Sequence, residues 1–200
     1  MALTLSQRKR LAIIEAAIVE FQLQGYQVAS MDAVAKRAEV SKRTVYNHFA
    51  SKEALFSELV RQLLEMGNKA TQLTYNPNIA IEKQLLEFAQ QEIALLQDIR
   101  FMSLSRIIMA QAMHSPEQAK KVMSDLGDQE NNLERWMSDA IKANKINPVQ
   151  PPYAARQFLG MIKSLAFWPQ MLTATPIPNA NLANQIAKDA VKMFVTHYKV

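Results

Sequence analysis

Three serine residues, each placed directly before a short amphipathic segment, constrain the first quarter of this 200-residue chain more than any other feature. They are Ser30 before residues 31–37, Ser41 before residues 42–48 and Ser51 before residues 52–73. A serine hydroxyl at an N-cap accepts a hydrogen bond from a backbone N–H group that the first helical turn leaves unpaired. The spacing therefore predicts three consecutive helices, the first two of which are only about two turns long.

Helical periodicity continues through almost the whole chain, and no segment alternates long enough to predict a β-strand. Leu11, Ile14, Ile18 and Phe21 recur at helical spacing before Gly25, which favours a helix end. Further along, proline and asparagine clusters separate the remaining predicted helices. These helices are expected at residues 79–97, 101–114, 115–144, 153–172 and 180–198. The sequence thus predicts an all-α fold of about nine helices.

Positive charge is concentrated near the N-terminus. Residues 1–52 hold eight Lys or Arg against four Asp or Glu, whereas residues 53–200 hold 15 against 14. A basic patch is usually only a solvated surface, but one confined to a single segment favours a polyanionic partner. The chain contains no cysteine, which excludes disulfides, thiolate metal sites and a cysteine nucleophile.

The second and third predicted helices form a helix-turn-helix pattern, because a turn of about three residues joins them. Its apolar inner face is expected to contain Val34, Ala35, Ala38, Val40, Val45 and Phe49. The opposite face of the later helix carries Lys42, Arg43, Thr44, Asn47 and His48. Such side chains read a major groove: arginine binds guanine, asparagine binds adenine, and threonine contacts a thymine methyl group or a phosphate. A helix N-terminus beside serine or lysine also suits a phosphate, which describes Ser41 and Lys52.

Residues 41–56 read SKRTVYNHFASKEALF and resemble the DNA-binding head of TetR-type transcriptional regulators. The Tyr-x-x-Phe pattern, the Ser-Lys-Glu-Ala-Leu-Phe pattern and the helix spacing carry this resemblance over about the first 60 residues. It implies that Lys42, Arg43, Thr44 and Asn47 contact bases or nearby phosphates. It further implies DNA-backbone contacts from Tyr46, His48 and Lys52, and an approach to the backbone by Ser30 and Met31.

Two further features bear on the resemblance. Heads of this type usually have glycine in the turn, where this chain has Glu39. A left-handed conformation there would cost a glutamate about 1 kcal/mol, and an acidic side chain near phosphates opposes binding. In the C-terminal half, residues 154–160 and Trp168 loosely resemble a subtype called AefR-like.

Large, soft side chains are frequent in the predicted helical body. Those expected to line an effector site are Met102, Met109, Met113, Trp136, Phe158, Met161 and Trp168. Each alone is more often plain core, but together they would line an adaptable apolar cavity between helices. We therefore expect a small apolar effector, oriented by polar groups such as Gln111, Asn132 or Tyr153. The competing interpretation is a close-packed core without a cavity.

The last predicted helix has an unusually broad apolar face, formed by Leu182, Ile186, Ala190, Met193 and Phe194. A lone surface helix does not need so broad a face, so the last two helices are expected to pair with their copies in a homodimer. The alternative is that this stripe packs only within its own chain. The predicted organisation is a helix-turn-helix DNA-binding domain at residues 1–49 and a helical effector-binding and dimerisation domain at residues 50–200.

Together these patterns favour the function of a ligand-responsive repressor. Two heads would occupy successive major grooves of a pseudo-palindromic double-stranded DNA operator, and a lipophilic effector would release them. Two other classes stay open: a non-specific DNA-binding protein without a ligand, and an enzyme with an accessory DNA-binding head. No metal, cofactor or catalytic residue is expected, because the three histidines are far apart and no catalytic motif occurs. No apolar run approaches a membrane span, so a cytoplasmic protein is expected.

Overall fold

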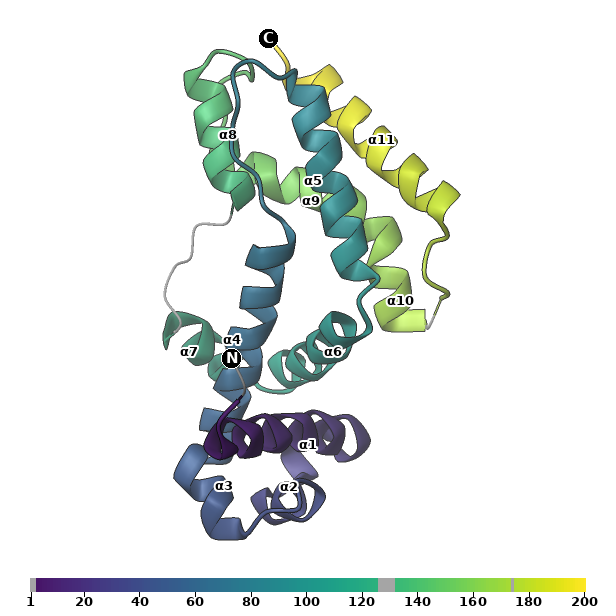
Figure 1. The fold of residues 1–200 in the computed structure, drawn as a ribbon. Helices are drawn as coiled ribbons and strands as arrows, with labels where there is room; N and C mark the ends of the chain where they lie inside the picture. Colours follow the sequence, from purple (N-terminus) through teal and green to yellow (C-terminus); the bar gives the residue numbers. More distant parts are fainter. Residues whose placement is uncertain (1–2, 126–131, 174) are drawn as a thin grey trace. The chain divides into compact units, whose positions relative to one another are not determined.

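The computed structural model describes residues 3–125, 132–173 and 175–200 (Figure 1). Within these ranges the named elements are eleven α-helices and no strand, which confirms the predicted all-α fold. The chain divides into two compact units. The head unit contains the residues up to Glu65 and the segment that begins at Ser103, and the body unit contains Met66–Met102 and the C-terminal part of the chain. This division differs from the expected boundary after residue 49.

The head unit contains helices α1 (Leu5–Val28), α2 (Met31–Arg37), α3 (Lys42–His48), the first part of α4 (Lys52–Ala70), most of α6 (Ile99–His114) and α7 (Pro116–Asp125). The three predicted serine caps are confirmed. The hydroxyl oxygens of Ser30, Ser41 and Ser51 each accept a hydrogen bond from a backbone N–H three residues later, at 3.1, 3.1 and 3.2 Å. The local signal in the sequence therefore fixes where α2, α3 and α4 begin.

Gly25 ends the regular part of α1, as predicted. Its φ of 75° and ψ of 156° interrupt the helix, and the backbone of residues 26–29 then leads into α2. A side chain at this φ would be strained, so glycine is the residue that the bend requires.

The head unit has a continuous apolar core. The buried side chains include Ile13, Ile14, Ile18 and Phe21 of α1, Val34 and Ala35 of α2, Val45 of α3, Phe49, and Leu55, Phe56 and Leu59 of α4. Ala35 is small, which allows close approach of neighbouring helices, and α2 packs against both α1 and α3. The two short helices, which would not be stable alone, are thus held by tertiary packing.

The body unit contains α5 (Ile81–Leu96), α8 (Asn132–Lys142), α9 (Pro151–Ala166), α10 (Trp168–Thr173) and α11 (Ala180–Tyr198). Helix α11 packs against α5 and α9, and α9 also contacts α8 and α10 (Figure 1). Phe158 lies at the centre, with its ring centroid 6.3 Å from that of Phe88 and 5.3 Å from that of Phe194. Among the described residues, no helix combines the length and the apolar character that crossing a membrane requires.

One predicted helix differs from the observed elements, and a second is described only in part. The expected helix at 153–172 is interrupted at Phe167, which separates α9 from α10. Pro169 lacks a backbone N–H group and its ring clashes with the preceding turn, which favours this break. The expected single helix at 115–144 is represented by α7 and α8, and its middle, residues 126–131, lies outside the described residues. The break at Phe167, together with the separate naming of α7 and α8 on either side of residues 126–131, gives eleven named helices among the described residues where about nine were expected.

Candidate DNA-binding surface

The turn between α2 and α3 adopts the geometry that a helix-turn-helix unit needs. Glu39 has a φ of 54°, so this position is left-handed. The backbone N–H of Val40 then donates to the carbonyl oxygen of Ala35 at 3.1 Å and closes the end of α2. A glutamate in this conformation is strained by about 1 kcal/mol, which the packing of α2 against α3 offsets.

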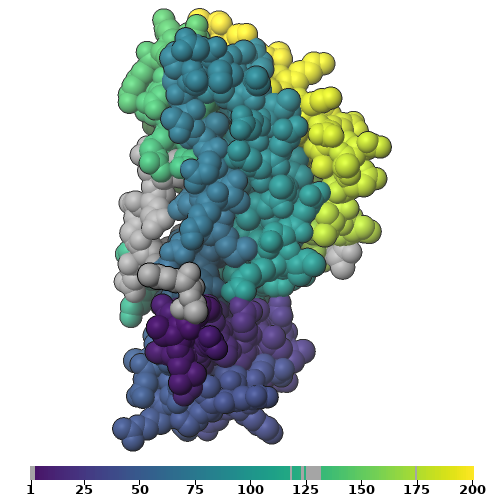
Figure 2. Space-filling model, viewed as in Figure 1, coloured from purple at the N-terminus to yellow at the C-terminus, as the bar shows by residue number. Residues whose placement is uncertain are grey.

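One face of α3 is open to solvent. Lys42, Arg43, Tyr46 and Asn47 are exposed, whereas Thr44 and His48 are half-buried. Arg43 and Asn47 are four residues apart and therefore lie on the same face of the helix. In the described part of the chain neither side chain has a hydrogen-bond or ion-pair partner. On the face that the space-filling view shows, residues of α2 and α3 form one edge of the head unit (Figure 2).

Lys42 differs from its neighbours because its charge is already paired. Its Nζ atom lies 2.8 Å from Oδ1 and 3.0 Å from Oδ2 of Asp32, on α2. The hydrogen bond to Asp32 and the charge of that carboxylate raise the pKa of Lys42. Both groups are well exposed, so the pair adds little stability. Its effect is to place a carboxylate beside the first turn of α3, where it reduces the positive potential of that surface.

Other predicted DNA contacts are engaged within the chain. The side chain of Met31 is buried in the core of the head unit, so it is not available to DNA in this conformation. The Ser30 hydroxyl is exposed and caps α2, and the Ser41 hydroxyl caps α3 and lies 2.9 Å from the Thr44 hydroxyl. The ammonium of Lys52 contacts three backbone carbonyl oxygens of the segment after Gly25. The open candidates are thus Arg43, Tyr46 and Asn47.

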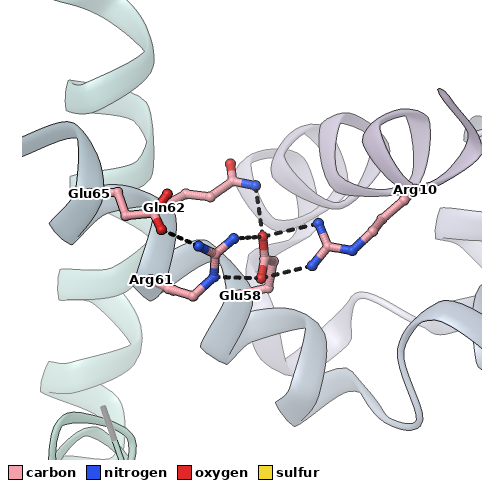
Figure 3. A network of polar contacts seen from close by, with 5 residues as sticks. All are labelled: Arg10, Glu58, Arg61, Gln62 and Glu65. Atoms are coloured by element: carbon pink, nitrogen blue, oxygen red, sulfur yellow. Dashed lines mark hydrogen bonds and ion pairs between the residues drawn. The ribbon is translucent and has the colours of Figure 1, made fainter. Parts of the chain in front are cut away.

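A buried carboxylate, which no sequence pattern predicted, joins α1 to α4 (Figure 3). Glu58 is 7% exposed and lies 2.9 Å from Arg10 of α1 and 2.6 Å from Arg61. The amide of Gln62 also donates to it at 3.0 Å, and Arg61 pairs with Glu65 in addition. Burial opposes ionisation of Glu58, but the hydrogen bonds from Arg61, Arg10 and Gln62 outweigh it and lower its pKa to about 2.

Arg10 has a second contact that reaches the helix-turn-helix unit. Its guanidinium carbon lies 5.0 Å from the ring centroid of Phe49, the residue that ends α3. A cation over an aromatic face is attracted by the ring quadrupole. Arg10 therefore connects α1, the end of α3 and Glu58 of α4.

The predicted effector residues are distributed over both units. Met109 and Met113 belong to the head unit, where Met113 is 69% exposed. Trp136 and Phe158 are fully buried in the body unit, and Met102 is also buried. Met161 lines a groove between α9 and α11, and Trp168 is 40% exposed and packs on Phe167.

The polar groups expected to orient an effector have partners within the chain. The side-chain oxygen of Gln111 accepts a hydrogen bond from Gln27 at 3.2 Å. The amide of Asn132 donates to the carbonyl oxygens of Asn68 and Thr71, at 3.2 and 2.7 Å. Over the described residues, no group of three His, Asp or Glu side chains could hold a metal ion.

Comparison with known families agrees with the geometry of the head unit. Residues 13–59 match the family described as bacterial regulatory proteins of the tetR family, and residues 83–200 match the C-terminal domain of AefR-like transcriptional repressors. Together these matches cover both the helix-turn-helix unit and most of the remaining chain.

Individual relatives extend over most of the chain. YhgD of Bacillus subtilis, described as an uncharacterized HTH-type transcriptional regulator, is 30% identical over 80% of this chain and 83% of its own. A TetR family regulator from Pseudomonas syringae is 36% identical, with a TM-score of 0.87 over 98% of this chain and 100% of its own. AibR, crystallised with isovaleryl coenzyme A and operator DNA, shares the fold at 22% identity, with a TM-score of 0.63 over 92% of this chain and 97% of its own. The chain is therefore a member of the TetR family of helix-turn-helix transcriptional regulators and has an AefR-like C-terminal domain.

Proposed function

We propose that this regulator is a dimeric, effector-responsive repressor that recognises a pseudo-palindromic operator through the exposed face of α3. The observation that carries the proposal is the open position of Arg43 and Asn47, one turn apart and without a partner among the described residues. A bidentate arginine distinguishes guanine and a bidentate asparagine distinguishes adenine in the major groove. Tyr46, also exposed, lies between them in sequence and suits a phosphate oxygen.

The proposal predicts base-specific losses at two positions. An operator fragment is first selected from random duplex DNA by the purified wild-type protein. Arg43→Ala and Asn47→Ala are each expected to weaken binding to this fragment by about 1–3 kcal/mol and to relax the preference at one base pair. Binding to unselected DNA depends mainly on phosphate contacts and is expected to change much less. Fluorescence anisotropy at fixed salt measures both affinities.

Lys188→Ala is the matched control, because it removes one exposed positive charge from α11 in the body unit. It is expected to leave the operator affinity within about twofold of wild type, because salt screens a single exposed charge outside the DNA-reading helices. Equal losses on selected and unselected DNA for Arg43→Ala and Asn47→Ala would refute base reading by α3. A wild-type protein that selects no sequence at all would instead favour the non-specific class.

The dimer is proposed from the surface that α9 and α11 share. Three residues of the predicted stripe, Ile186, Ala190 and Phe194, are buried within their own chain. This part of the stripe therefore packs within the monomer, as the alternative interpretation predicted. Leu182 and Met193, however, are 46% and 55% exposed. A groove of about 500 Å³ runs beside Met193 and is lined by Gln157, Gly160, Met161, Ser164, Phe194, His197 and Tyr198. The small residues in this groove leave room for an apposed helix of a second copy.

Met193→Glu is expected to convert the dimer into a monomer without unfolding it. A carboxylate placed in a desolvated two-fold interface meets its own copy across the axis, whereas at an exposed site of a monomer it costs little. Sedimentation at micromolar concentration should show the wild type as a dimer and the variant at half that mass. Asn184→Glu is the control on an exposed position of α11 that borders α5 instead. A wild type that sediments as a monomer contradicts the proposed interface.

Release by an effector is the third part of the proposal. Its support is the family membership, the buried aromatic and sulfur-containing side chains of the body unit, and AibR, a protein of the same fold that was crystallised with both an acyl coenzyme A and operator DNA. A compound that binds the folded chain raises its melting temperature, and a true effector also weakens operator binding because it favours another conformation. A broad set of lipophilic compounds that gives neither effect would remove this part and leave a constitutive DNA-binding protein.

A further inference from the structure

Lys52, the first residue of α4, has all of its hydrogen-bonding capacity engaged inside the head unit. Its Nζ atom donates to the backbone carbonyl oxygens of Tyr26 at 2.7 Å, Gln27 at 3.1 Å and Ala29 at 3.0 Å. An ammonium group has three N–H donors and no acceptor. The three carbonyl oxygens therefore account for every donor that Lys52 has.

The carbonyl oxygens converge on Lys52 because of the bend at Gly25. Carbonyl groups at a helix C-terminus have no partner in their own helix and carry partial negative charge, so they attract a cation. The positive φ of Gly25 turns the chain so that the carbonyl groups of Tyr26, Gln27 and Ala29 face one point. The ammonium also lies 4.6 Å from the ring centroid of Tyr26, a cation–π distance.

Tyr26 ties the same segment to α4 a second time. Its ring packs edge-on against Phe21 of α1 and Phe56 of α4, with centroid distances of 5.3 and 4.9 Å. Its hydroxyl donates to Glu53 Oε1 at 3.5 Å, and the pKa of Glu53 is lowered, chiefly by a hydrogen bond from its own backbone N–H. Lys52, Tyr26 and Glu53 together form an α1–α4 clamp.

The clamp acts on the segment that sets the position of the DNA-reading helices. Ala29, whose carbonyl oxygen accepts from Lys52, directly precedes Ser30, the N-cap of α2. Helix α2 in turn packs against α3. A shift of residues 26–29 relative to α4 would therefore displace α2 and α3 together.

We propose that Lys52 is a positioning residue for DNA recognition, which acts by hydrogen bonds to the end of α1 and not by neutralising a DNA phosphate. The proposal rests on the proposed operator binding by α3, but it concerns a different group and a different kind of contact. The ammonium has no free donor to offer a phosphate unless it leaves the three carbonyl oxygens. Loss of the Lys52 ammonium should weaken binding to all DNA sequences. It should not lower the number of counterions that the DNA releases when the protein binds.

Because the chain contains no cysteine, a cysteine introduced at residue 52 can be modified selectively. The modification separates the positive charge of this side chain from its N–H donors. Lys52→Cys introduces a single thiol, which is alkylated in denaturant before refolding of the full chain. With 2-bromoethylamine the thiolate displaces bromide and the product carries an ammonium with three donors at nearly the length of lysine. With (2-bromoethyl)trimethylammonium bromide the product carries the same charge but no N–H donor. Lys42→Cys, treated with the same two reagents, is the matched control at an exposed lysine of α3.

Operator affinity and its salt dependence are measured for each form. Unmodified Lys52→Cys and Lys52→Met are expected to bind at least tenfold more weakly, about 1.4 kcal/mol, with an unchanged slope of log affinity against log salt. The ammonium derivative should restore affinity and the trimethylammonium derivative should not. At Lys42 the two derivatives should behave alike. The proposal is wrong if both derivatives restore binding at residue 52 and the unmodified variants have a shallower slope, by about 0.9 for one lost phosphate contact. The role of Lys52 would then be electrostatic.

Amide hydrogen exchange gives a readout that needs no DNA. Exchange at residues 26–31 is expected to accelerate in Lys52→Met and in the trimethylammonium derivative, and to return to wild-type protection in the ammonium derivative. If the wild type binds no operator, the proposed function fails while this result still decides whether the clamp exists. Unchanged protection in all forms would refute the clamp even where DNA binding persists.

Discussion

Replacing Gln84 by alanine is expected to lower the free energy of unfolding of the chain by about 3–4 kcal/mol. The Gln84 amide is buried, at 4% exposure, and uses its full hydrogen-bonding capacity. Its oxygen accepts from the backbone N–H of Asn76 and from the indole N–H of Trp136, both at 2.9 Å. Its nitrogen donates to the carbonyl oxygens of Asn76 and Ile79, at 2.9 and 2.6 Å. Alanine leaves a cavity and a buried indole donor without an acceptor.

Two further variants separate hydrogen bonding from packing. Gln84→Glu keeps the shape and the acceptor for Trp136 but turns a carboxylate oxygen toward two carbonyl oxygens, so it should destabilise at neutral pH and less in acid. Gln90→Ala, on the exposed face of the same helix, should change stability by about 0.5 kcal/mol or less. Urea unfolding, followed by tryptophan fluorescence and circular dichroism, provides the free energies. If Gln84→Ala is no more destabilising than Gln90→Ala, Gln84 does not have the structural role described.

The second large effect is expected at Glu58, whose replacement by alanine should cost about 3 kcal/mol. A carboxylate that is buried but accepts from two arginines and Gln62 stabilises α1 against α4. Lowering its pKa from an ordinary value of 4.5 to about 2 would correspond to about 3 kcal/mol at neutral pH. Arg10 and Arg61 are 38% and 43% exposed, so solvent screening reduces the contribution of ionised Glu58 to about 2 kcal/mol.

The pH dependence has a definite sign. Because the pKa of Glu58 is depressed in the folded state, its contribution is complete above about pH 4.5 and is lost as the pH falls toward 2. Glu58→Gln should therefore be less stable than the wild type at pH 6, and the difference should shrink steadily below pH 4.5. Glu65→Gln, which also removes a carboxylate partner of Arg61 but at a well-exposed site, is the control and should show little difference. A difference between wild type and Glu58→Gln that is independent of pH would show that the effect is packing and not ionisation.

The two variants change different units and are expected to affect operator binding in different ways. Gln84 and its partners belong to the body unit, whereas Glu58 lies in the head unit and is joined through Arg10 to Phe49 at the end of α3. Loss of Glu58 should therefore weaken operator binding at temperatures where the chain is still folded. Gln84→Ala should weaken it chiefly by reducing the folded population.

Local features of the chain were sufficient to predict where α2, α3 and α4 begin and that Arg43 and Asn47 face outward. A serine cap acts within one turn, and Gly25 acts through its own backbone angles. For this reason the starts of α2, α3 and α4 and the exposed positions of Arg43 and Asn47 agree with the sequence. Pro169 favours the break that precedes it, but the apolar periodicity continues through this position and predicts a single helix.

Only the tertiary structure decided which polar groups are already engaged. Glu58 meets Arg10 across 48 positions, Trp136 meets Gln84 across 52, and Lys52 reaches back 23 to 26 residues to the end of α1. A sequence pattern records which face of a helix a residue occupies but not which distant group it touches, because that depends on how the helices cross. Lys52 was accordingly expected at a DNA phosphate and is found among carbonyl oxygens, and Met31 was expected near the DNA backbone and is found in the core. The sequence thus determined which residues of α3 face outward, whereas helix packing determined which nearby residues, such as Lys52 and Glu58, hold the helices of the head unit in place.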